Sequence, residues 1–133
     1  MYRFAINELI LWKKKENRKP LIIMGARQVG KTWLMKEFGQ KNYDKVAYIS
    51  FYNNKRMDAV FQSDFDKKRI IMNLNIETGI SITPNDTLII LDEIQDSPKV
   101  LESLKYFCEE APEYHVIAAG SLLGVAIHEG VSY

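Results

Sequence analysis

A glycine-rich stretch near the N-terminus places the strongest constraint on the fold of this chain. Residues 25–32 read Gly-Ala-Arg-Gln-Val-Gly-Lys-Thr, which matches the pattern G-x-x-x-x-G-K-T. A short apolar run over 21–24 precedes this stretch, and a segment rich in helix formers, 31–38, follows it. A strand, a glycine-rich turn and a helix start in this order predict a phosphate-binding loop. We expect Gly39 to end the helix.

The residue types of this loop predict its chemistry. Gly25 and Gly30 permit backbone angles that a side chain would forbid, so that main-chain amides can approach an anion closely. Lys31 is expected to reach the β- and γ-phosphates of a nucleotide, and the Thr32 hydroxyl is expected to coordinate Mg²⁺. The predicted phosphate-contacting residues are Gly25, Ala26, Arg27, Gln28, Val29, Gly30, Lys31 and Thr32.

Composition limits the class of protein. The 133 residues suffice for one domain, and 47% hydrophobic with 26% charged residues is typical of a globular chain. A net charge of +1 gives no general attraction to nucleic acid or membranes. The single cysteine excludes a disulfide within the chain, and the two histidines are too few for a zinc site. No apolar run approaches the about 20 residues that span a bilayer, so we expect a cytoplasmic protein with no membrane partner.

The rest of the chain alternates between helical and strand patterns. Strands are predicted over 21–24, 45–51, 87–91 and 115–119, and helices over 2–17, 31–38, 57–61, 65–78 and 98–111. Trp33, Leu34, Met35 and Phe38 are expected to face the core, and Ser63 or Asp64 to cap the helix over 65–78. Strands that alternate with helices predict an α/β fold, with a parallel sheet and helices on both of its faces.

A basic cluster follows the first predicted helix. Its members are Lys13, Lys14, Lys15, Arg18 and Lys19. We interpret the cluster as a solvated helix end, where cations favour the negative end of the helix dipole. Contact with nucleic acid is the alternative, but no aromatic residues interleave with these charges to provide a stacking surface.

A second motif combines an apolar strand with two acids. Residues 88–93 read Leu-Ile-Ile-Leu-Asp-Glu, the pattern called Walker B. Asp92 is expected to hold Mg²⁺ together with Thr32, mostly through a coordinated water. Glu93 is expected to orient and deprotonate the water that attacks the γ-phosphorus. A solvated strand end is the alternative interpretation of these acids. Gln95 is also near them, and its role is open.

Ser121 is the third candidate site residue, because it follows the strand predicted over 115–119. Its hydroxyl would face the γ-phosphate if this strand lies between those that carry Lys31 and Asp92. There it could sense the phosphate or position the attacking water. A helix cap for the following segment is the other interpretation, and the residues leave the two open.

Together these elements resemble the ATPase domain of a prokaryotic AAA+-like family of ATP-binding proteins. The similarity rests on the stretches GARQVGKT, LIILDEIQDSP with LESLKYF, and VIAAGSLLG, and it covers about residues 1–128. The resemblance implies the additional-strand (AAA+/RecA-like) type of P-loop NTPase fold. It also implies ATP as the nucleotide, phosphate binding by residues 25–32, Mg²⁺ held through Thr32 and Asp92, catalysis by Glu93 and sensing by Ser121. The predicted catalytic residues are therefore Glu93, Lys31 and Ser121.

The chain departs from the family at its C-terminal end. Similar proteins continue into another helix and strand, an arginine-bearing region and usually a nuclease-like domain, whereas this sequence stops at Tyr133. We therefore expect an N-terminal fragment or a shortened product, whose single P-loop core is incomplete. Residues 1–19 would form its N-terminal helix and basic segment, and 20–133 its nucleotide-binding sheet. The strand over 21–24 would lie at an exposed edge, so the chain is expected either to be marginally stable or to self-associate through this edge.

Three functions fit these features. The first is an ATPase core that drives or regulates an unidentified protein or nucleic-acid partner. The second is a nucleotide-binding module without significant turnover, because the sequence offers no candidate arginine finger after the last predicted strand. The third is a P-loop kinase, against which the pair Asp92-Glu93 argues, because a base beside the metal-binding acid suits water activation.

Overall fold

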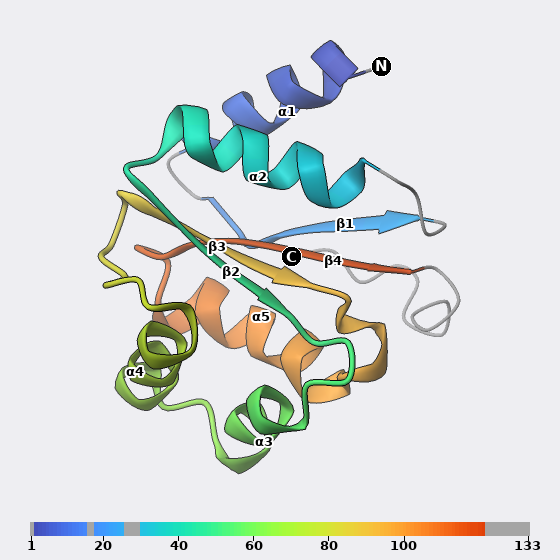
Figure 1. Ribbon diagram of the computed structural model, residues 1–133. Coiled ribbons are helices and arrows are strands. Elements are labelled where there is room, and N and C mark those ends of the chain that lie inside the picture. Colours follow the sequence, from blue (N-terminus) through green and yellow to red (C-terminus); the bar gives the residue numbers. More distant parts are fainter. Residues whose placement is uncertain (1, 16–17, 26–29, 122–133) are drawn as a thin grey trace.

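The computed structural model of the chain describes residues 2–15, 18–25 and 30–121. Among these residues, four parallel strands form one sheet between two layers of helices (Figure 1). The strands are β1 (Leu21–Gly25), β2 (Lys45–Ser50), β3 (Thr87–Asp92) and β4 (His115–Ser121). The helices are α1 (Tyr2–Lys14), α2 (Lys31–Asn42), α3 (Lys55–Ser63), α4 (Lys67–Thr78), α5 (Pro98–Glu110) and the short 3₁₀ helix η1 (Ile94–Asp96). The α/β class predicted from the alternation of patterns is confirmed.

The strand order of the sheet is β1-β4-β3-β2. β4 therefore lies between β1 and β3, as the additional-strand type of P-loop fold requires. In register, Gly25 at the end of β1 pairs with Ser121 of β4, and Ser50 of β2 pairs with Asp92 of β3. Because all four strands are parallel, the carboxyl ends of β1, β3 and β4 lie at one edge of the sheet, which is where open α/β sheets bind ligands.

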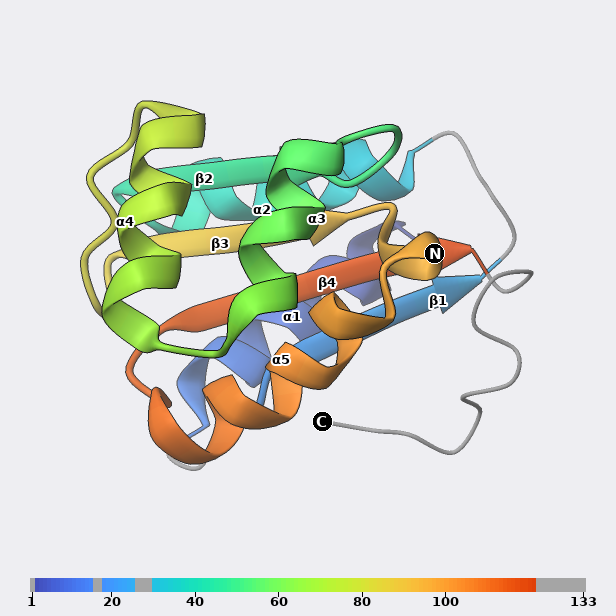
Figure 2. The same cartoon turned by 90° about the horizontal axis from the view of Figure 1, so that it is seen from below.

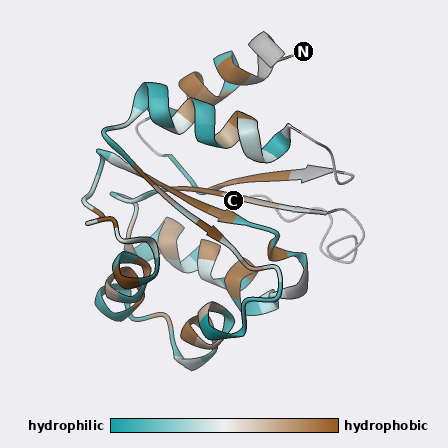
Figure 3. Cartoon of the chain, in the orientation of Figure 1, coloured by the Kyte–Doolittle hydropathy of each residue, from teal (hydrophilic) through white to brown (hydrophobic). Residues whose placement is uncertain are grey.

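Each face of the sheet is covered by its own helices and has its own apolar core. α1 and α2 cover one face, and α3, α4 and α5 cover the other (Figures 1 and 2). Residues of β3 alternate between the two cores, since Leu88 and Ile90 pack toward α1 and α2 while Ile89 and Leu91 pack toward α3 to α5. Hydrophobic residues accordingly concentrate along the strands (Figure 3). A sheet covered on both faces explains why β3 reads as a continuous apolar run.

Two predictions about α2 are wrong. Gly39 does not end this helix, which continues to Asn42. A Cβ atom at Gly39 would lie 2.7 Å from Cγ2 of Val46 and 3.0 Å from Cδ2 of Leu88, so glycine here allows the helix to approach the sheet closely. Trp33, which we expected in the core, is 53% exposed, because it faces away from the sheet at the start of the helix.

Other helix ends differ from the prediction by a few residues. Asp66, and not Ser63 or Asp64, caps α4, since its carboxylate accepts a hydrogen bond from the Arg69 backbone N–H at 3.0 Å. Asp64 instead accepts a hydrogen bond from the Arg69 side chain. α1 ends at Lys14 rather than at residue 17, whereas α4 ends at Gly79 as predicted, with the left-handed φ of 73° that glycine adopts without strain.

The described residues bear on two expectations about partners. Within the part of the chain that the structure describes, β1 pairs with β4 on one side and with no strand on its other side. Self-association through the β1 edge therefore stays a prediction. No helix in the same residues is both long enough and apolar enough to cross a membrane.

Candidate functional site

The carboxylate of Asp92 is the centre of the candidate site. Asp92 is the last residue of β3 and only 2% exposed. Its Oδ2 accepts hydrogen bonds from the Thr32 hydroxyl at 2.6 Å and from the Tyr48 hydroxyl at 2.8 Å, and its Oδ1 accepts one from the Glu93 backbone N–H at 2.9 Å. A buried carboxylate is costly without such donors, so the chain fixes this group in place with donors from α2, from β2 and from the residue that follows β3.

The start of α2 suits an anionic ligand. Gly30, immediately before the helix, has a φ of 113°, which strains any residue with a side chain. Because glycine has no side chain, the N-cap residue Gly30 cannot provide a capping oxygen to the start of α2, and the first turn of the helix contains no acid. The first backbone N–H groups of an α-helix have no acceptor within the helix, and its N-terminus carries partial positive charge. This helix start, which also presents Lys31, therefore favours a negatively charged group.

Lys31 extends from the start of α2 to the end of β4. Its Nζ donates a hydrogen bond to the carbonyl oxygen of Gly120 at 3.0 Å, across 89 positions of sequence. The lysine side chain is half-buried, and the carbonyl is a single neutral acceptor for three ammonium protons. The arrangement brings the cation to the same edge of the sheet as Thr32 and Asp92.

The second acid, Glu93, has an unusual backbone conformation. Its φ of 57° and ψ of 47° lie in the left-handed region, which costs a residue with a side chain roughly 1–2 kcal/mol. Such conformations concentrate at functional sites. The side chain of Gln95 on η1 donates a hydrogen bond from Nε2 to Oε1 of Glu93 at 2.9 Å. Gln95, whose role the sequence left open, thus holds the Glu93 carboxylate.

Gly120 gives Gln95 the room for this contact. A Cβ atom at Gly120 would lie 3.3 Å from Oε1 of Gln95 and 3.4 Å from its backbone nitrogen. Glycine therefore lets the end of β4 pack directly on η1. Since the same residue accepts the hydrogen bond from Lys31, the backbone of Gly120 lies between the lysine and the glutamine that contacts Glu93.

Sequence reasoning missed Tyr48, which contacts Asp92. Tyr48 is on β2, and its ring also lies beneath Nζ of Lys36, 4.0 Å from the ring centroid. Burial raises the pKa of the Tyr48 hydroxyl, and the hydrogen bond and charge of Asp92 raise it further, so the phenol stays protonated and donates at neutral pH. The alternation of β2 places Val46, Tyr48 and Ser50 on the α2 face of the sheet, which was the available signal.

Some predicted site residues cannot be placed in this geometry. Ala26, Arg27, Gln28 and Val29 lie outside the described residues. For Ser121, the structure describes only the backbone. Ser121 is the last residue of β4, and it pairs with Gly25 of β1. The strand order expected for Ser121 is thus confirmed, and its role in sensing phosphate stays a prediction.

Comparison with known protein families agrees with this arrangement. A family model described as an AAA domain matches residues 17–132, which is most of the chain. The chain belongs to the AAA domain family. A search of curated protein sequences finds no match. Membership of an AAA-type ATPase family indicates nucleotide binding and ATPase chemistry in general, and the match bears out the AAA-like part of the resemblance noted from the sequence.

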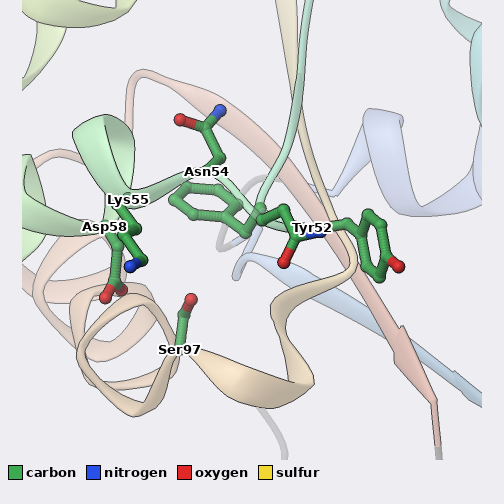
Figure 4. Close-up of a pocket in the computed structure, with 7 residues that line it drawn as sticks. Tyr52, Asn54, Lys55, Asp58 and Ser97 are labelled. Carbon is green, nitrogen blue, oxygen red and sulfur yellow. The ribbon is translucent and has the colours of Figure 1, made fainter.

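The AAA domain also has a small hollow on the face of the sheet that α3, α4 and α5 cover. It is lined by Phe51, Tyr52, Asn53, Asn54, Lys55, Asp58 and Ser97. Lys55, Asp58 and Ser97 lie around this hollow, between the starts of α3 and α5, whereas the Tyr52 ring points away (Figure 4). Its volume of about 200 Å³ is below the roughly 300–1,000 Å³ of typical ligand pockets, so we do not assign the nucleotide to it.

Proposed function

We propose that this AAA domain binds ATP with Mg²⁺ at the carboxyl edge of its sheet and hydrolyses the ATP, and that this chemistry drives or regulates the activity of a partner. The observation that carries the proposal is the convergence of Lys31, Thr32 and Asp92. Thr32 Oγ1 lies 2.6 Å from Asp92 Oδ2, and Lys31 Nζ lies 3.0 Å from the Gly120 carbonyl oxygen at the same edge. A cation, a hydroxyl and a carboxylate beside a helix N-terminus match what a nucleoside triphosphate with its metal requires.

Binding of the phosphates would use the loop over residues 25–30 and the start of α2. The backbone amides of the loop and of Lys31 and Thr32 would donate to phosphate oxygens, with the helix dipole adding positive potential. Lys31 would exchange its contact with the Gly120 carbonyl for the β- and γ-phosphates, because a charged acceptor makes the stronger hydrogen bond.

Thr32 and Asp92 have the donor atoms that Mg²⁺ prefers, since hydroxyl and carboxylate oxygens suit this hard cation. The Thr32 hydroxyl donates its proton to Asp92, which leaves its oxygen lone pairs available for a metal. When bound, Mg²⁺ neutralises charge that develops on the β- and γ-phosphate oxygens. The carboxylate of Asp92 would keep the threonine hydroxyl oriented for that contact.

Hydrolysis would use Glu93 as the general base. Glu93 would accept a proton from water as the water oxygen bonds to the γ-phosphorus, and the bond from that phosphorus to the bridging oxygen of ADP would break. The products are ADP and inorganic phosphate. The contact from Gln95 supports this role, because a base held by a neighbouring side chain needs less reorganisation before it reacts.

A nucleotide-binding module with negligible turnover is the second candidate. The observation that favours it concerns the arginines: Arg18 donates to the carbonyls of Lys13 and Lys15, Arg56 pairs with Glu77, and Arg69 pairs with Asp64. None of these described arginines contacts the site residues. An arginine that stabilises the transition state is worth about 10³–10⁵ in rate in related chemistry. We therefore expect slow basal hydrolysis by the chain alone.

Calorimetric titration of ATP–Mg²⁺ into the wild type and Lys31→Ala tests the proposal. Loss of a charge-assisted hydrogen bond worth about 1.5–3 kcal/mol should weaken binding roughly 10- to 100-fold. Lys41→Ala is the matched control, because Lys41 is on the same helix, pairs with Glu37 and has a side chain that is 70% exposed. Equal affinities for all three proteins would remove Lys31 from the site, and no binding by the wild type would reject the proposed function.

A further inference from the structure

Tyr48 is the contact of the candidate site that neither the loop motif nor the paired acids contain. It lies within β2, where its register partner on β3 is Ile90, two residues before Asp92. Its side chain therefore runs along the sheet toward the carboxyl edge, and its hydroxyl donates to Asp92 Oδ2 at 2.8 Å. The position of Tyr48 on a neighbouring strand gives Asp92 a donor from the sheet in addition to the donor from α2.

We propose that Tyr48 is a positioning residue that orients the Asp92 carboxylate for Mg²⁺, an inference that rests on the proposed function. Two hydroxyls share one oxygen of this carboxylate, since Thr32 Oγ1 is 2.6 Å and Tyr48 OH is 2.8 Å from Oδ2. The Thr32 hydroxyl is expected to contact the metal directly, so its geometry changes on binding. Tyr48 has no such second task and keeps the carboxylate plane fixed while Thr32 adjusts.

Lys36 supports this role by fixing the tyrosine ring. Its Nζ lies 4.0 Å from the ring centroid of Tyr48, which is a cation–π contact. Lys36 is four residues after Thr32 on α2, so it lies one turn further along the same face of the helix. α2 thus contacts both the carboxylate, through Thr32, and the side chain that orients it, through Lys36.

Groups that hydrogen-bond to a metal ligand affect the affinity for the metal by a known amount. Removal of a group that holds a ligand in place typically costs about 10- to 100-fold in metal affinity or activity, although the group never touches the metal. Three donors hold Asp92 in the described structure, through Thr32, Tyr48 and the Glu93 backbone. Loss of the tyrosine hydroxyl should leave each oxygen of the carboxylate with one donor and so loosen its orientation, and the cost should appear in the Mg²⁺ requirement.

Tyr48→Phe tests the inference, because it removes the hydroxyl but keeps the ring above which Lys36 lies. ATP affinity should be measured by calorimetry in EDTA and across a Mg²⁺ series, together with Mn²⁺ binding to the ATP complex by electron paramagnetic resonance. We expect an ATP affinity in EDTA equal to that of the wild type, and a half-saturating Mg²⁺ or Mn²⁺ concentration raised about tenfold or more. Thermal unfolding followed by circular dichroism verifies that the variant is folded.

Tyr106→Phe is the control, since Tyr106 is on α5 beyond the other face of the sheet and its ring packs against Phe65 and Phe107. This variant should keep the metal requirement of the wild type. Equal metal requirements for wild type and Tyr48→Phe would overturn the inference alone. A loss of ATP affinity of the same size with and without Mg²⁺ would also overturn it, because that result indicates a structural role. Failure of the wild type to bind ATP would overturn both the inference and the proposed function.

Discussion

The Thr32 hydroxyl donates a hydrogen bond of 2.6 Å to Asp92, although the two residues are 60 positions apart in the sequence. The contact exists because α2 starts directly after β1 and the loop, while Asp92 ends β3, two strands away from β1 in the sheet. It ties the start of the helix that would hold phosphate to the strand that would hold the metal.

Glu93→Gln should keep the affinity for ATP–Mg²⁺ and lower the hydrolysis rate at least about 100-fold, because the amide cannot accept the proton of the attacking water. Steady-state release of phosphate, measured beside calorimetric ATP affinity, checks this result. Asp92→Asn is the comparison variant and should instead weaken Mg²⁺-dependent binding, since it removes the charge that would hold the metal. Hydrolysis at the wild-type rate by Glu93→Gln would mean that another residue is the base.

Gln95→Ala should lower kcat about tenfold and leave KM for ATP unchanged. The reason is that Gln95 donates a hydrogen bond to Glu93 at 2.9 Å, so its loss disorders the base while Lys31 and Thr32, which are expected to hold the phosphates and the metal, stay in place. Initial rates across an ATP series separate the two parameters. Gln95→Asn, which has the same amide on a shorter side chain, should recover part of the rate only if the contact can still form. A rise in KM with unchanged kcat would contradict this positioning role.

Folding stability should fall between pH 7 and pH 5 because of His115. Its Nδ1 lies 2.6 Å from the Tyr43 hydroxyl and its Nε2 lies 3.2 Å from Oδ1 of Asn85. Burial, followed by the charges of Arg18 and Lys13, lowers the pKa of His115 to about 4. Because this value is below the roughly 6.5 of the unfolded chain, the folded state favours the neutral ring. The resulting stability is present above about pH 6.5 and is lost as the pH falls toward 4.

The expected loss from pH 7 to pH 5 is about 1–2 kcal/mol in the free energy of unfolding. Urea unfolding at several pH values measures it. His115→Gln should be less stable at pH 7 and should show a flatter profile over this range, because it removes the titrating ring. Parallel profiles for the two proteins would assign the acid sensitivity to other groups.

Gly39→Ala should destabilise the fold by about 1–2 kcal/mol, although alanine is the better helix former by up to about 1 kcal/mol. The added methyl group would lie 2.7 Å from Cγ2 of Val46 and would push α2 away from the sheet. Chemical unfolding measures the change, with Gln40→Ala as a control at the exposed neighbouring position. Combining Gly39→Ala with Val46→Ala should cost less than the sum of the two single changes, because the second substitution makes room for the first.

Local patterns in the sequence were enough to predict most elements of the sheet and the residue types of the site. The strands β1 to β4 were found within two residues of their observed ends, because strands buried on both faces produce short apolar runs between turn residues. The glycine-rich stretch and the pair Asp92-Glu93 were recognisable because each motif is contiguous. Their order in the chain also implied that Lys31, Thr32 and Asp92 meet at one edge, since parallel strands end on the same side.

Only the tertiary structure decided the features that depend on packing between distant residues. Gly39 resembles a helix end in the sequence, and only the 2.7 Å approach of its hypothetical Cβ to Val46 shows why glycine is needed inside α2. Tyr48 looks like any strand tyrosine until the pairing of β2 with β3 brings its hydroxyl to Asp92. The contact between Gln95 and Glu93 is local in the sequence, but it needs the turn of η1 and the close approach of Gly120 from β4. Alternation along β2 indicates which of its residues share a face, but which strand lies beside β2, and which residue of β3 each one opposes, depend on the pairing of strands that are far apart in the sequence.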